Sequence, residues 1–129
     1  MRFIPTKFHA PLDYIVGAGL IAAPWIFQFS EHTTPTVLTI VLGIGLIAYS
    51  LLTDYELGVW RVFPMAVHNL YDIAAGAVLV ASPWIFGFAD DGANVWAPFV
   101  VVGIAAIGLG LTTKQGSRGY RKQATPAAG

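Results

Sequence analysis

Four apolar stretches, each of 19 or 20 residues, alternate with short polar segments along the chain. They cover residues 11–29, 35–53, 69–88 and 95–113. At 1.5 Å per residue a helix of this length measures about 28–30 Å, which matches the hydrocarbon core of a bilayer. Membrane strands need about ten residues with strict alternation, and these stretches do not alternate. The pattern predicts an all-α membrane protein with four transmembrane helices.

Composition supports the same prediction. The chain is 56% hydrophobic and only 11% charged, whereas soluble domains carry about 25% charged residues. Because this share of charged residues is too small for the surface of a soluble protein of this size, we expect the outer surface to face lipid. The sequence has no cysteine, which excludes disulfides, thiolate nucleophiles and cysteine metal ligands.

The charges are unevenly distributed between the two ends of the predicted spans. All seven basic residues fall on one side, and the opposite connections have no Lys or Arg and carry Glu31, Asp90 and Asp91. The basic set is Arg2, Lys7, Arg61, Lys114, Arg118, Arg121 and Lys122. The positive-inside rule therefore predicts a multi-pass protein of the cell membrane, plasma or inner, with both termini in the cytoplasm.

The chain contains an internal repeat. The string R-x2-P-x3-H-x3-D-x3-G-x6-P-W-I-F-x-F begins at Arg2 and again at Arg61, 59 positions later. The following spans match more weakly after a one-residue insertion, so that Thr53 meets Thr113. We expect two tandem parallel two-helix repeats, residues 1–58 and 59–113, which form a four-helix bundle. Residues 114–129 are expected to be a basic, flexible cytoplasmic tail.

The second copy resembles a known family. Ser82-Pro83-Trp84, in the first helix of a two-span unit, is similar to the signature of the SPW repeat proteins, and the first copy has Ala23-Pro24-Trp25 in its place. The resemblance implies a small integral membrane protein and does not imply an activity. The alanine at position 23 argues against a symmetric catalytic serine.

The signature residues have a structural interpretation. A proline inside a helix leaves a carbonyl without its helical partner, which kinks or ends the helix. Tryptophan is favoured at the membrane interface. We therefore interpret Pro24, Trp25, Ser82, Pro83 and Trp84 as a kink and interface anchor. An aromatic pocket for a lipid or quinone tail is the alternative.

The chemical candidates form one polar cluster at the cytoplasmic entrance of the first and third spans. Its members are Arg2, His9, Asp13, Arg61, His68 and Asp72. Each His–Asp pair is four residues apart, so each pair shares a helix face. In the structural reading the aspartates lie in first helical turns, the histidines lie in the wet interfacial layer, and the arginines pair with the aspartates. Alternatives are an ion or proton site, a metal or haem bridged by His9 and His68, and catalysis.

We therefore predict an integral membrane protein with a structural, assembly or accessory role. We expect no enzymatic activity, because the chain lacks a phosphate-binding glycine loop, H-E-x-x-H and G-x-S-x-G. No cofactor and no metal are predicted. The expected partner is the lipid bilayer, with a homo-oligomer or another membrane protein compatible with the small-residue helix faces, and no nucleic acid. The first alternative is a small carrier or channel that uses the His–Asp pairs, and the second is a haem- or metal-binding electron carrier.

Overall fold

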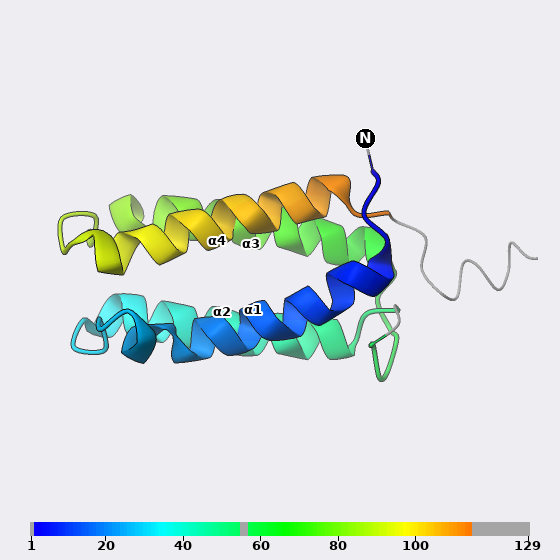
Figure 1. The fold of residues 1–129 in the computed structure, drawn as a ribbon, viewed down its shortest axis with the longest axis horizontal. Coiled ribbons are helices and arrows are strands. Elements are labelled where there is room, and N and C mark those ends of the chain that lie inside the picture. Colours follow the sequence, from blue (N-terminus) through cyan, green and yellow to red (C-terminus); the bar gives the residue numbers. More distant parts are fainter. Residues whose placement is uncertain (1, 55–56, 115–129) are drawn as a thin grey trace, which may run out of the picture.

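The computed structural model describes residues 2–54 and 57–114, which form four helices (Figure 1). These are α1 (Thr6–Ile26), α2 (Thr33–Leu51), α3 (Met65–Ile85) and α4 (Ala93–Thr112). Strand-type pairing in the described residues is limited to two isolated bridges. The all-α prediction is therefore confirmed for this part of the chain. The predicted flexible tail lies outside the described residues from position 115 onward.

Prolines determine where α1 and α3 begin and end. Each helix starts directly after an extended proline, Pro5 or Pro64, because a φ near −65° suits a helix start and the missing N–H is not needed there. The starts are therefore four or five residues earlier than predicted. Both helices end two residues after the proline of the Pro-Trp sequence. A residue with positive φ then follows, Gln28 at 58° and Gly87 at 76°.

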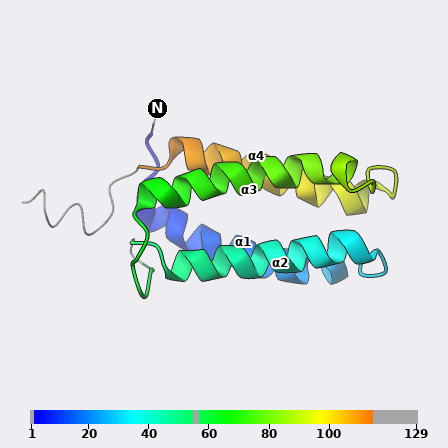
Figure 2. The ribbon, with the colours of Figure 1, turned by 180° about the vertical axis from the view of Figure 1, so that it is seen from behind.

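The helices are arranged as two antiparallel pairs. Most helix-to-helix contact is between α1 and α2 and between α3 and α4, and the two pairs touch more sparingly along α2–α3 and α1–α4. Figures 1 and 2 show the pairs as two layers that extend in the same direction. We call the end where α1 and α3 begin the foot, and the opposite end the far end.

Glycines bring the helices of each pair into backbone contact. A Cβ on Gly43 would lie 2.6 Å from the carbonyl oxygen of Gly17, and a Cβ on Gly103 would lie 2.7 Å from that of Gly76. The same close approach thus occurs in both pairs. By contrast, a Cβ on Gly45 would meet nothing within 4 Å. The repeated Gly17 and Gly76 are therefore packing positions.

Three helices, α2, α3 and α4, are long and apolar enough to cross a membrane. Helix α1 does not meet this criterion, and its first part carries Lys7, His9 and Asp13. Large apolar side chains such as Ile15, Val41 and Ile104 are exposed along the helices, as expected for a surface in lipid. The membrane character is shown, whereas the fourth span stays a prediction.

Both ends of the structure connect the two helix pairs. At the foot, the amide of Ile4 donates to the carbonyl of Thr112 at 3.0 Å, and the amide of Lys114 donates back to Ile4 at 2.9 Å. At the far end, the side-chain Nδ2 of Asn94 donates to the backbone carbonyl of Phe27 at 2.9 Å. An apolar core lies behind that contact and includes Phe29, Phe88, Val95 and Phe99.

Candidate functional site

The two repeated His–Asp pairs meet at the foot, between α1 and α3. We call His9, Asp13, His68 and Asp72 the His–Asp cluster. The histidines are fully buried, and the aspartates are 4% exposed. The predicted wet interfacial position of the histidines is therefore wrong. The aspartates lie about two turns inside their helices, and neither first turn contains an acidic residue, so their predicted first-turn position is also wrong.

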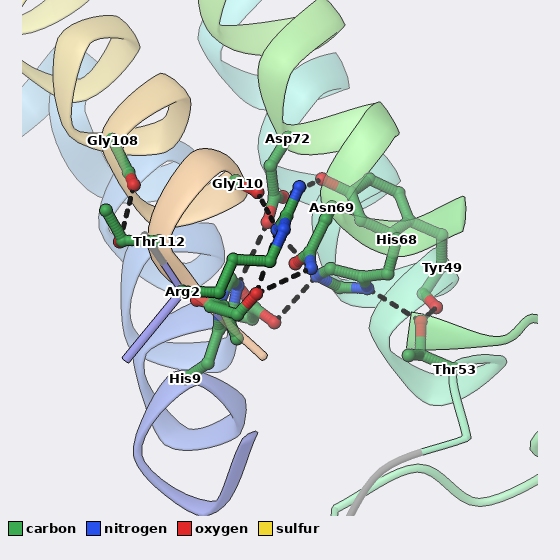
Figure 3. A network of polar contacts seen from close by, with 12 residues as sticks. Arg2, His9, Tyr49, Thr53, His68, Asn69, Asp72, Gly108, Gly110 and Thr112 are labelled. Carbon is green, nitrogen blue, oxygen red and sulfur yellow. Dashed lines mark hydrogen bonds and ion pairs between the residues drawn. The ribbon is translucent and has the colours of Figure 1, made fainter. Parts of the chain in front are cut away.

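The carboxylates bridge the two imidazole rings. His9 Nε2 lies 2.9 Å from Asp13 Oδ1 and 2.9 Å from Asp72 Oδ2. His68 Nε2 lies 2.9 Å from Asp13 Oδ2 and 3.5 Å from Asp72 Oδ2. The two rings are edge to face with centroids 5.3 Å apart, and Figure 3 shows them converging with Asp72. Each aspartate therefore contacts a histidine of its own helix and one of the opposite pair.

Threonine hydroxyls hold the other nitrogen of each imidazole. His9 Nδ1 lies 2.6 Å from Thr113 Oγ1, and His68 Nδ1 lies 2.7 Å from Thr53 Oγ1. Thr53 donates its own hydroxyl proton to the carbonyl of Tyr49 at 2.6 Å, so it accepts the proton of His68 Nδ1. The Nε2 atom is then the one that faces the carboxylates. Thr53 follows α2 and contacts His68 on α3, whereas Thr113 follows α4 and contacts His9 on α1. Each threonine therefore contacts the histidine of the other helix pair.

Two residues that contact the histidines were not among the predicted site residues, although the repeat in the sequence indicates them. Thr53 and Thr113 are equivalent positions of the repeat, so the repeat could have identified them. Tyr49, which donates its hydroxyl to Asp72 Oδ1 at 3.0 Å, could not be found this way. Its equivalent in the second unit is Leu109, which has no hydroxyl. The two halves of the site therefore differ at this position.

The predicted arginines bind backbone carbonyls near the foot. Arg2 donates to Gly110 at 2.7 Å and to Thr113 at 2.9 Å, as Figure 3 shows in part. Arg61 donates to Gly58 at 3.1 Å, within the middle connection. Arg2 therefore fixes the N-terminal segment to the end of α4.

The SPW repeat domain matches residues 7–113, a range that contains both His–Asp pairs and all four helices except the first residue of α1. The chain belongs to the SPW repeat family. Comparisons with curated proteins and with solved structures gave no significant match.

The SPW signatures lie at the far end, away from the His–Asp cluster. Trp25 and Trp84 are 60% and 63% exposed on the outer surface. Ser82 is buried and donates to the carbonyl of Val78 at 2.6 Å, a bond within its own helix. Each signature proline precedes a helix end. The signature residues therefore occupy positions of helix termination and surface aromatic packing.

A cavity of about 330 Å³ lies between the two helix pairs, between the foot and the far end. Asp13, Asp72 and Tyr49 border it, and most of its walls are apolar side chains from all four helices, such as Leu20, Leu46, Leu79 and Val102. The carrier alternative predicts a polar cavity at this depth. The cavity exists, but its walls offer few polar groups to a hydrated solute.

The His–Asp cluster has the chemistry to hold a cation or protons. Each of its four residues offers one nitrogen or oxygen ligand atom, and these atoms lie within 4.8 Å of one another. Buried carboxylates require a compensating charge, which either imidazolium protons or a metal ion supply. The hydroxyls of Thr113 and Thr53 contact these histidines, but Thr53 donates its proton to the carbonyl of Tyr49, whereas a catalytic nucleophile donates its proton to the imidazole.

Proposed function

We propose that this SPW repeat protein has a structural, assembly or accessory role in the cell membrane and no enzymatic activity. One observation carries the proposal. The buried contacts of the His–Asp cluster cross from one helix pair to the other, with His9 on Asp72 and His68 on Asp13. Since the helix pairs otherwise touch sparingly, the cluster holds them together at the foot.

The proposed architecture is a four-helix bundle of two parallel repeats, with α1 as the fourth span. Equivalent contacts support it. His9 binds Thr113 as His68 binds Thr53, and Gly17 approaches Gly43 as Gly76 approaches Gly103. An approximate two-fold axis along the membrane normal, through the His–Asp cluster, relates such pairs. Helix α1 then crosses the membrane because its counterpart α3 does.

The carrier or channel alternative has less support. A channel for ions needs polar groups along its path, whereas the cavity beside Asp13 and Asp72 is walled mainly by apolar side chains. The cluster itself is closed by ion pairs among its own members. A structural role requires neither a polar route across the membrane nor a conformational change.

Cysteine labelling tests the proposed topology. The chain has no native cysteine, so single Glu31→Cys, Asp90→Cys and Lys114→Cys variants each carry one thiol. A membrane-impermeant thiol reagent applied to intact cells should label the first two variants, and Lys114→Cys only after lysis. Labelling of Glu31→Cys and Lys114→Cys from the same side would exclude this topology.

Distance measurements test whether the cluster holds the two pairs together. Spin labels at Phe8→Cys on α1 and Leu70→Cys on α3, which are 59% and 65% exposed, should report one narrow distance distribution in detergent. Adding Asp13→Asn should broaden it, because both bridges from that carboxylate are weakened. His32→Gln, which changes an exposed pair with Asp91, is the matched control. A distribution that stays narrow in the Asp13→Asn background would contradict the proposal.

A further inference from the structure

We propose that His9, Asp13, His68 and Asp72 form a binding site for one divalent transition metal ion of the zinc type. The inference goes beyond the structural role, because the cluster can join the helix pairs with or without the ion. It assigns a ligand class to a set of buried side chains that comes from two different parts of the chain.

The spacing of the donor atoms fits a four-coordinate ion. Zinc binds imidazole nitrogen at about 2.0–2.1 Å and carboxylate oxygen at about 2.0–2.2 Å, so neighbouring donors of a tetrahedral site lie about 3.4 Å apart. The donor contacts in the cluster are 2.9, 2.9, 2.9 and 3.5 Å. One donor atom from each of the four residues lies within 4.8 Å of the other three, so an ion would draw the most widely separated donors together by roughly 1–1.5 Å.

The orientation of the donors also favours a shared central ligand. His9 Nε2 and Asp72 Oδ2 are 2.9 Å apart, yet neither has a hydrogen-bond partner of suitable geometry among the described residues. Both residues are at least nine-tenths buried. The two atoms therefore converge without being aligned as a donor and an acceptor, which is the arrangement that a common cation satisfies.

The threonines supply the outer contacts that metal-binding histidines need. A histidine ligand nearly always donates its second ring N–H to an oxygen, which fixes the tautomer and directs the other nitrogen at the metal. His68 Nδ1 makes this contact with Thr53, and His9 Nδ1 lies 2.6 Å from the equivalent hydroxyl of Thr113. In a neutral ring Nε2 then presents a lone pair to the centre of the cluster.

Charge and ligand type identify the class of ion. Two carboxylates balance a divalent cation, so the occupied buried site is neutral. Two imidazoles and two carboxylates suit zinc and its first-row neighbours. Calcium takes six to eight oxygen ligands and magnesium prefers an octahedral shell with several waters. No sulfur ligand is present to favour Cu(I), since the sequence contains no cysteine and the cluster contains no methionine.

Metal titration of the purified full chain tests the proposal. The protein in detergent, first stripped with a chelator, should bind one Co²⁺ per chain, with the intense visible absorption of a tetrahedral site. Zn²⁺ should displace it and raise the thermal unfolding midpoint. His9→Gln should abolish the absorption. His32→Gln, which changes the remaining histidine at the far end, should leave stoichiometry and absorption unchanged.

Two further variants keep the test decisive if His9→Gln fails to fold. Thr53→Val and Thr113→Val keep all four ligands and remove one outer contact each, so each should weaken Co²⁺ binding roughly 10- to 100-fold. The proposal is overturned by a wild-type protein that binds no stoichiometric metal, or by affinities that none of these variants changes. The distance measurements on Asp13→Asn, made with chelator present, test the structural role separately.

Discussion

Asp72→Asn is expected to lower the free energy of unfolding by about 3–5 kcal/mol, because removing one member of a buried ion pair leaves the other charge uncompensated. The Asp72 carboxylate contacts both His9 and His68, so both imidazoles lose a charged partner at once, while the asparagine oxygen can still accept the Tyr49 hydroxyl. Unfolding of the full chain in detergent, with chelator present to exclude metal effects, measures the change.

The matched control for this substitution is Asp91→Asn. Asp91 also pairs with a histidine, His32, but its side chain is 39% exposed, so its removal should cost about 0–1 kcal/mol. The structural role of the cluster is contradicted if Asp72→Asn unfolds like the wild type. If Asp72→Asn is as stable as the wild type and also alters ion flux in liposomes, the carrier alternative replaces the structural role.

Gly43→Ala and Gly103→Ala are each expected to destabilise the protein by about 1–3 kcal/mol, because the added methyl group has no space. At Gly43 the new Cβ would lie 2.6 Å from a backbone oxygen of Gly17, and at Gly103 it would lie 2.7 Å from that of Gly76. Backbone atoms in helices cannot rotate away as a side chain can. The helices of each pair would therefore have to separate.

Gly45→Ala and Gly108→Ala provide the controls, since a Cβ at either position would meet nothing within 4 Å. In a helix, alanine is otherwise more stable than glycine by about 0.5–1 kcal/mol. These controls should therefore raise stability slightly while Gly43→Ala lowers it. Equal effects in detergent unfolding for Gly43→Ala and Gly45→Ala would show that the close approach does not contribute to stability.

The apolar runs predict the helices well but place their ends less well. All four helices overlap the predicted spans, because twenty apolar residues strongly favour a helix in lipid. The starts of α1 and α3 lie earlier than the predicted spans because polar residues interrupt the apolar runs near each helix start, Lys7 and His9 in α1 and His68 and Asn69 in α3. Hydropathy assigns such residues to the interface, whereas helix geometry depends on backbone φ and on what covers the side chains.

The sequence predicts part of the candidate site. The repeat identified His9 and His68 as equivalent, but only the tertiary arrangement buries them together with Asp13 and Asp72. Tyr49 reaches the site from another helix, and no spacing along the chain indicates a contact 23 residues away. Likewise, the sequence does not say which face of α2 meets α1, so it does not show that Gly43 lies against Gly17 while a Cβ on Gly45 would meet nothing within 4 Å.

The backbone contacts at the foot have a consequence for how the two units are joined. The segment around Ile4 pairs with residues after α4 just as the segment around Phe63 pairs with residues after α2, in the bridges Ile4–Thr113 and Thr53–Phe63. The contact between the segments before α1 and after α4 is thus equivalent to the contact between the segments after α2 and before α3. Two separate copies of one unit could make the same contacts as a homodimer. The middle connection would then act as a tether, which raises the effective concentration of one half for the other.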